Sequence, residues 1–231
     1  MNKLDTPFKI TCTLTFIISV IIGQVYCVDT GEFNRLLAKW KEDQNGQYDH
    51  PEDSTSGRTL LVYKMGQTMD SKFVPLLEKI LIADHYACVR AEAAKSLERI
   101  GDSSAIPTLM KSLNADGNVE VSLDVARTLL TLNEFSNDVY DKMYSIARGQ
   151  NRDKWSYKGF YNKQEEVTDT SLSDKFKNHL QFEAIKCLEM ISNDEALKIL
   201  EEQETSSNVI IAEIAKNTKS KWLAKYKSGI K

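Results

Sequence analysis

This sequence of 231 residues has few of the residues and motifs that mark common catalytic and metal sites. Its three histidines, His50, His85 and His179, lie far apart and show no recurring ligand spacing for zinc or iron. It has no GxGxxG string, no phosphate-binding Walker motif and no GxSxG nucleophile motif, so neither nucleotide binding nor acyl transfer is indicated. We therefore expect no metal, no cofactor and no enzymatic activity.

An excess of positive charge is also absent. The sequence has 30 Lys and Arg residues against 33 Asp and Glu residues, which gives a formal net charge of −3. Nucleic-acid-binding proteins usually carry a positive surface that displaces counterions from phosphates, so nucleic acid is not an expected partner. The proportions of charged (27%) and hydrophobic (42%) residues are typical of a folded, helix-rich protein.

Cysteine is scarce after residue 27, where only Cys88 and Cys187 occur. The two cysteines show no CxxC spacing, so a zinc site is not indicated. In the repeat register described below they lie roughly three units apart, which is too far for a disulfide. We expect two buried thiols.

Charge is missing altogether from residues 10–28, "ITCTLTFIISVIIGQVYCV". Lys3 and Lys9 come before this run, and its most apolar part is Phe16–Ile22. A basic start followed by an apolar stretch is typical of an export signal, so residues 1–27 are predicted to be a signal peptide.

Three fates of this segment remain open. Cleavage after Cys27 would place Val25 and Cys27 at the positions that favour small residues, whereas lipidation would make Cys27 the acylated first residue. Without cleavage the segment would serve as a membrane anchor, the membrane contact being confined to this end of the chain. Each fate places the body of the protein in the periplasm or cell envelope of a bacterium. Removing residues 1–27 would leave a net charge of −4.

A repeated pattern fills most of the chain. Val89 begins "VRAEAAKSLERIGDSSAIPTLMKSL", and the similar "VSLDVARTLLTL" begins at Val121. Weaker copies begin at Leu180 and Ile210, and an earlier one covers Arg58–Leu81. Self-similarity at a period of roughly 30 residues predicts a solenoid.

Each copy reads as two helices, because apolar residues recur three and four positions apart. In the copy that begins at Val89, Gly101 ends the first helix, and Asp102 or Ser103 caps the second. Pro107 suits the first turn of the second helix, where its missing N–H is not needed. Neither helix can bury its apolar stripe alone, so neighbouring pairs stack into one core.

The arginines of the repeats are predicted to be structural. Arg90 and Arg127 are expected to pair with aspartates of neighbouring units, rather than to bind an anionic ligand. The candidate partners are Asp84, Asp102 and Asp116.

The valine-arginine start, the paired alanines, "IGD" and "AIP" resemble a HEAT-like repeat of the type found in phycobilisome lyases and many bacterial scaffold proteins. The resemblance covers roughly Arg58–Tyr226. It implies an all-α solenoid of about five helix pairs, wound as a right-handed superhelix with a curved binding face, and no particular chemistry. An iron enzyme built on such repeats, deoxyhypusine hydroxylase, uses His-Glu pairs, and this sequence has none.

Residues 28–56 are predicted to form an amphipathic helix over Thr30–Glu42 that caps the first repeat, followed by a polar linker. The solenoid then occupies residues 57–231 and contains an insertion at residues 148–175. Because of this insertion, the copy that begins at Val121 is followed by the next only at Leu180, nearly twice the usual spacing.

The insertion interleaves basic and aromatic residues, which often dominate binding hot spots. Its candidate partner-binding residues are Arg152, Lys154, Trp155, Tyr157, Lys158, Phe160 and Tyr161. The alternative is that the aromatic side chains fold back and cover the flank of the solenoid.

The function predicted from the sequence is that of a non-enzymatic scaffold in the bacterial cell envelope. It would bind a protein partner through the concave face and the insertion. Two alternatives remain: a lyase-like enzyme or accessory subunit that uses the solenoid groove, and a structural envelope protein that associates with itself.

Overall fold

The computed structural model describes residues 30–45, 51–155 and 173–227. Within these ranges the chain forms α-helices and short 3-10 turns and no strand, so the predicted all-α class is confirmed. The helices are α2 (Thr30–Asn45), α3 (Pro51–Gln67), α4 (Val74–Ala83), α5 (Ala87–Ile100), α6 (Ile106–Ala115), α7 (Val119–Thr131), α8 (Asn137–Ala147), α9 (Asp174–Cys187), α10 (Asp194–Glu204) and α11 (Val209–Tyr226).

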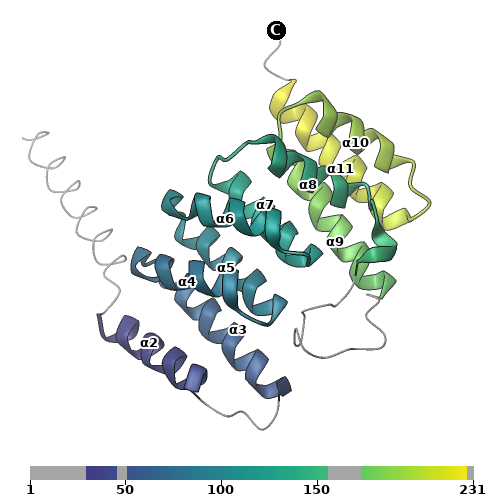
Figure 1. Ribbon diagram of the computed structural model, residues 1–231. Helices are drawn as coiled ribbons and strands as arrows, with labels where there is room; N and C mark the ends of the chain where they lie inside the picture. Colours follow the sequence, from purple (N-terminus) through teal and green to yellow (C-terminus); the bar gives the residue numbers. More distant parts are fainter. Residues whose placement is uncertain (1–29, 46–50, 156–172, 228–231) are drawn as a thin grey trace, which may run out of the picture.

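The helices stack in chain order, from α2 at one end to α11 at the other (Figure 1). Helices α3 to α10 follow one another as four helix–turn–helix units. The first helix of each unit contacts the first helix of the next, and each second helix packs against the first helix that follows it. This arrangement is an α-solenoid. About five pairs were predicted, but in the described part of the chain the copy beginning at Ile210 supplies only the single helix α11.

Local sequence signals set the helix boundaries as predicted. Gly101 ends α5 in the left-handed region, at φ +72°, where a side chain would be strained. The Asp102 carboxylate accepts a hydrogen bond from the backbone N–H of Ser104, and Pro107 occupies the first turn of α6. Asp70 and Pro75 have the same roles one repeat earlier, before and within α4. The same chemistry therefore precedes both α4 and α6, where the aspartate caps the short 3-10 turn that leads into the helix.

Hydrogen bonds from side chains join the first helices of successive repeats. The Ser96 hydroxyl donates to the Val62 carbonyl at 2.9 Å, linking α5 to α3. The Thr128 hydroxyl donates to the Ala94 carbonyl at 3.1 Å, which links α7 to α5 in the same register. Small residues at these crossings let the helix backbones lie close together, and Gly66 of α3 lies directly against Ser96.

A second ladder joins the repeats through ion pairs. Arg58 pairs with Asp84. At the equivalent position of the next repeat Arg90 forms a bidentate pair with Asp116, in which its Nε and Nη2 atoms lie 2.6 and 3.1 Å from the two carboxylate oxygens. The structural role predicted for Arg90 is therefore confirmed. Asp102 was wrong as a candidate partner, because its carboxylate is used as the helix cap.

The N-terminal helix α2 covers the first repeat. Its Leu36 and Trp40 are buried, and the Arg58 guanidinium lies 4.6 Å from the centre of the Trp40 ring. The polar stretch after α2 differs from the predicted linker, because α3 already begins at Pro51. Proline suits the first turn of a helix, so this residue marked a helix start as well as a turn.

No disulfide joins Cys88 to Cys187, as the repeat register predicted. Cys187 is buried, as predicted, and burial raises the pKa of its thiol to about 12. Cys88 is only half-buried, so the prediction of a buried thiol is wrong for this residue. None of the helices in the described ranges is long and apolar enough to span a membrane. Residues 1–27, including Cys27, lie outside those ranges, so the predicted signal peptide stays a prediction.

Candidate functional site

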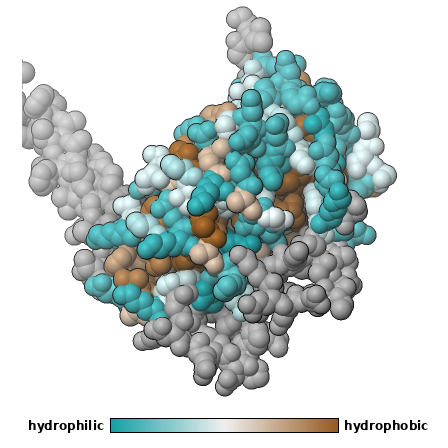
Figure 2. Space-filling view, viewed as in Figure 1, coloured by the Kyte–Doolittle hydropathy of each residue, from teal (hydrophilic) through white to brown (hydrophobic). Residues whose placement is uncertain are grey.

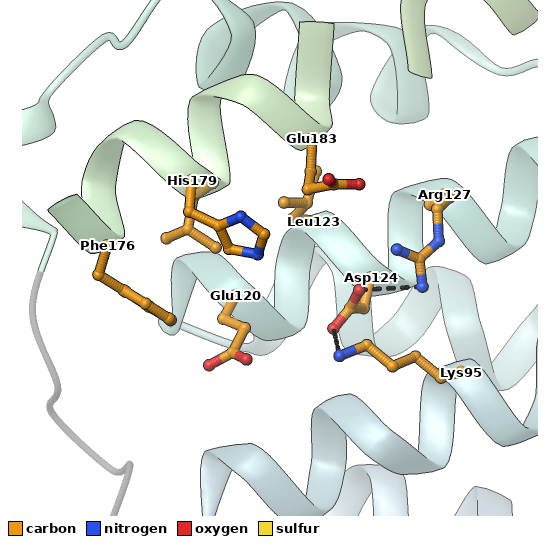
Figure 3. Close-up of a pocket in the computed structure, with 9 residues that line it drawn as sticks. Lys95, Glu120, Leu123, Asp124, Arg127, Phe176, His179 and Glu183 are labelled. Carbon is orange, nitrogen blue, oxygen red and sulfur yellow. Dashed lines mark ion pairs between the residues drawn. The ribbon is translucent and has the colours of Figure 1, made fainter. Parts of the chain in front are cut away.

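The stacking of the first helices changes between α7 and α9. These two helices contact each other less than α3 contacts α5 or α5 contacts α7. A cleft of about 180 Å³ lies at this junction. It is lined by Lys95 from α5, by Glu120, Leu123, Asp124 and Arg127 from α7, and by Phe176, His179, Leu180 and Glu183 from α9 (Figure 3).

Helical spacing brings these side chains to one place. Glu120, Asp124 and Arg127 are four and three residues apart, so they lie on one face of α7. The same spacing places the three polar and aromatic residues of α9 on the face turned toward α7. Asn118 fixes the start of α7, because its side-chain oxygen accepts hydrogen bonds from the backbone N–H groups of Glu120 and Val121.

The cleft lies at the junction where the ion pair that joins α5 to α7 has no counterpart between α7 and α9 among the described residues. Lys95 of α5 pairs with Asp124 of α7 at 3.1 Å. The repeat places Arg127 where Lys95 stood, and Glu183 where Asp124 stood, so the next rung would join those two. Arg127 instead pairs with Asp124 and with Glu98, each at 3.1 Å. The structural role predicted for Arg127 is confirmed, but its predicted partner is wrong, because the aspartate lies on its own helix and the partner in the neighbouring unit is a glutamate.

Glu183 pairs with a residue of its own helix. Its carboxylate lies 3.3 Å from the ammonium group of Lys186, three residues further along α9. The two residues that would close the junction therefore have other partners, and the space between α7 and α9 stays open.

Glu120 is a strongly perturbed carboxyl group of the cleft. Burial raises its pKa from the usual 4.5 to about 7, with Lys95 acting in the opposite direction and Asp124 adding to the rise. Its Oε2 atom is buried and has no hydrogen-bond partner among the described residues. Burial also raises the pKa of Asp124, although Lys95 and Arg127 offset part of that effect.

The Glu120 shift predicts a pH dependence of stability. The folded protein binds more protons than the unfolded chain between pH 4.5 and about 7, so stability falls as the pH rises through this window. Glu120→Gln stays neutral, so we expect little change at about pH 5 and a gain of about 1–3 kcal/mol in the free energy of unfolding at about pH 8. Urea unfolding at both pH values measures this, and an equal effect at both would contradict the assignment.

The rest of the visible surface is mainly hydrophilic, with hydrophobic residues in a few small patches (Figure 2). The large hydrophobic side chains that are exposed come from separate places in the chain: Leu60, Tyr63, Met69, Ile82, Phe135, Val209 and Ile210. Scattered apolar residues of this kind are normal on protein surfaces. The charged cleft is therefore the stronger candidate for recognition.

Three of the seven residues predicted to bind a partner in the insertion are described. Trp155 is only 7% exposed and packs in the core, which fits the alternative in which the insertion covers the solenoid. Arg152 donates to Gln181 at 3.0 Å and also to Asn178, both on α9, while Lys154 is exposed.

The other four, Tyr157, Lys158, Phe160 and Tyr161, lie outside the described residues. Partner binding by the insertion therefore stays a prediction.

The cleft residues were not identified from the sequence. Glu120, Asp124 and Glu183 occupy ordinary repeat positions, and only the long spacing between the copies at Val121 and Leu180 signalled a changed junction. In the part of the chain that the structure describes, no group of three or more His, Cys, Asp and Glu side chains is placed to hold a metal ion.

Comparison with known families supports the repeat assignment. Residues 53–153 match the family model for HEAT repeats, a range that covers most of α3 and all of α4 to α8. A search of curated proteins found no match. The match and the succession of helix–turn–helix units together support a HEAT-like repeat architecture, in agreement with the resemblance of residues 89–113 to such a repeat.

Proposed function

We propose that this protein is a non-enzymatic scaffold that binds a protein partner, and that the cleft between α5, α7 and α9 is its recognition site. HEAT repeats generally act as protein-interaction scaffolds. The observation that carries the proposal is that no ion pair joins Arg127 of α7 to Glu183 of α9. An open cleft lies between the two helices, and the buried Oε2 atom of Glu120 lies beside it without a partner among the described residues.

The size of the cleft favours recognition of a side chain over recognition of a metabolite. Pockets for cofactors and drug-sized ligands usually occupy about 300–1,000 Å³. A cleft of about 180 Å³ is smaller than this range and matches one inserted side chain. A protein partner supplies such a side chain together with a wider contact area around it.

The sequence supports a cell-envelope location and a wider interface. The charge-free run at residues 10–28 is typical of an export signal, which would bring the solenoid to a partner in the envelope. Residues 148–175 join α8 to α9, so the insertion starts and ends beside the helix that forms one wall of the cleft. The concave face and the insertion would extend the contact area around the cleft.

Selection of binding peptides tests the proposal. A random peptide library displayed on phage is panned against the full chain, and the enriched peptides are tested against two charge-reversal variants. Glu183→Arg places a positive charge in the cleft, and we expect a loss of binding of about tenfold or more. Glu201→Arg makes the same change on the exposed surface of α10, and binding should be retained. Equal binding to both variants, or no enriched peptides, would contradict the proposed function.

A further inference from the structure

The charges that line the cleft do not balance. Of its two cations, Lys95 pairs with Asp124, and Arg127 pairs with Asp124 and Glu98. Two further carboxyl groups line the cleft, those of Glu120 and Glu183. The two lining cations already have carboxylate partners, and Glu183 pairs with Lys186, which does not line the cleft. Glu120 is the lining carboxyl group whose buried Oε2 atom has no partner among the described residues.

Glu120 shows the imbalance most clearly. Lys95 and Cys88 of α5 and Asp124 of α7 influence this group, and Arg127, His179 and Glu183 line the same cleft. None of them donates a hydrogen bond to its buried Oε2 atom. A buried carboxylate without a donor is costly, and a cation that enters the cleft would supply the missing partner.

From the charges that line the cleft we propose that it receives a basic side chain of the partner protein, held by the carboxylates of Glu120 and Glu183. The inference rests on the proposed scaffold function and names the chemistry that the partner must carry. Phe176 also lines the cleft, and the face of an aromatic ring favours a cation. A guanidinium or ammonium group with its alkyl stem suits this combination of acidic and aromatic walls.

An anionic ligand fits less well. It would have to draw Lys95 or Arg127 away from carboxylates that already lie 3.1 Å from their nitrogen atoms. It would also approach Glu120 and Glu183, whose negative charges oppose it. The cations of the cleft therefore hold the acidic wall together, and the acidic groups face the occupant.

Titration of the full chain with N-acetyl-arginine amide tests the inference. Amide NMR spectra monitor the titration at low salt and about pH 8, where Glu120 is mostly ionised. We expect saturable shifts confined to α5, α7 and α9, with a dissociation constant in the millimolar range. Glu120→Gln should weaken binding about tenfold, whereas Glu201→Gln, on the surface of α10, should not. N-acetyl-citrulline amide, which has nearly the same shape without the charge, should give no saturable shifts.

Three results would overturn the inference. They are the absence of saturable shifts with the arginine probe, equal binding of the citrulline probe, and preferential binding of sulfate in the same cleft. The peptide selection separates this failure from that of the scaffold function. Peptides whose binding depends on the cleft but requires no Arg or Lys would refute only the inference that a basic side chain enters it. A lack of peptides whose binding depends on the cleft would refute the scaffold function.

Discussion

Arg90→Ala is expected to lower the free energy of unfolding by about 3–5 kcal/mol, the usual cost of removing one partner from a buried ion pair. The Arg90 side chain is almost fully buried, and its guanidinium contacts the Asp116 carboxylate through two nitrogen atoms. It also donates to the backbone carbonyls of Asp84 and His85. Its removal leaves the carboxylate and both carbonyls without this donor, at the joint between two repeats.

The exposed pair of Arg35 and Glu32 on α2 provides the control. These side chains are 57% and 35% exposed and lie three residues apart on one helix. Arg35→Ala should therefore leave the free energy of unfolding almost unchanged. Urea unfolding followed by circular dichroism measures both variants. Similar small losses for the two arginines would contradict the structural role of the Arg90 ladder.

Gly66→Ala is expected to lower the free energy of unfolding by about 1–3 kcal/mol, although alanine is the better helix former. A Cβ atom at residue 66 would lie 2.5 Å from the Ser96 hydroxyl oxygen and 2.8 Å from the Ser96 Cα atom. The second of these is a backbone atom, so α3 and α5 would have to move apart. That movement would also lengthen the hydrogen bond from Ser96 to Val62.

Gly57→Ala is the matched control on the same helix. Apart from its chain neighbours and the backbone of its own helical turn, no described atom lies within 4 Å of the position that its Cβ would take. The substitution should be neutral or stabilise the protein by up to about 1 kcal/mol, because alanine favours the helix. Thermal unfolding of the two variants distinguishes a steric effect from a general effect of removing glycine. A stabilised Gly66→Ala protein would mean that α3 and α5 do not pack this closely.

The helix pairs could be predicted from the sequence because local chemistry decides their boundaries. Gly101, Asp102 and Pro107 each act within one turn of their own position. The pairing of Arg90 with an aspartate of the next unit could also be predicted, since the repeat fixes which positions face each other. The choice of Asp116 over Asp102 could not, because both residues lie at turns between helices.

The cleft could not be predicted, because it depends on how far α7 stands from α9. In the sequence Arg127 and Glu183 occupy the positions equivalent to Lys95 and Asp124, so they would be expected to form the corresponding ion pair between α7 and α9. Only the structure shows that Arg127 pairs with Asp124 of its own helix and with Glu98 of the preceding helix α5, and that Glu183 pairs with Lys186. Likewise, Trp155 looked like an exposed binding residue, although its side chain is buried in the core.

The most direct test of recognition at the cleft is site-specific photo-crosslinking in the native host. A photoreactive amino acid replaces His179, an exposed residue that lines the cleft, and in a second strain it replaces Lys198, which is exposed on α10. We predict a discrete protein adduct from position 179 that excess untagged wild-type protein prevents and excess Glu183→Arg protein does not. Position 198 should give no such adduct. The same adducts from both positions, or none from position 179, would contradict the proposal that the cleft receives a protein partner.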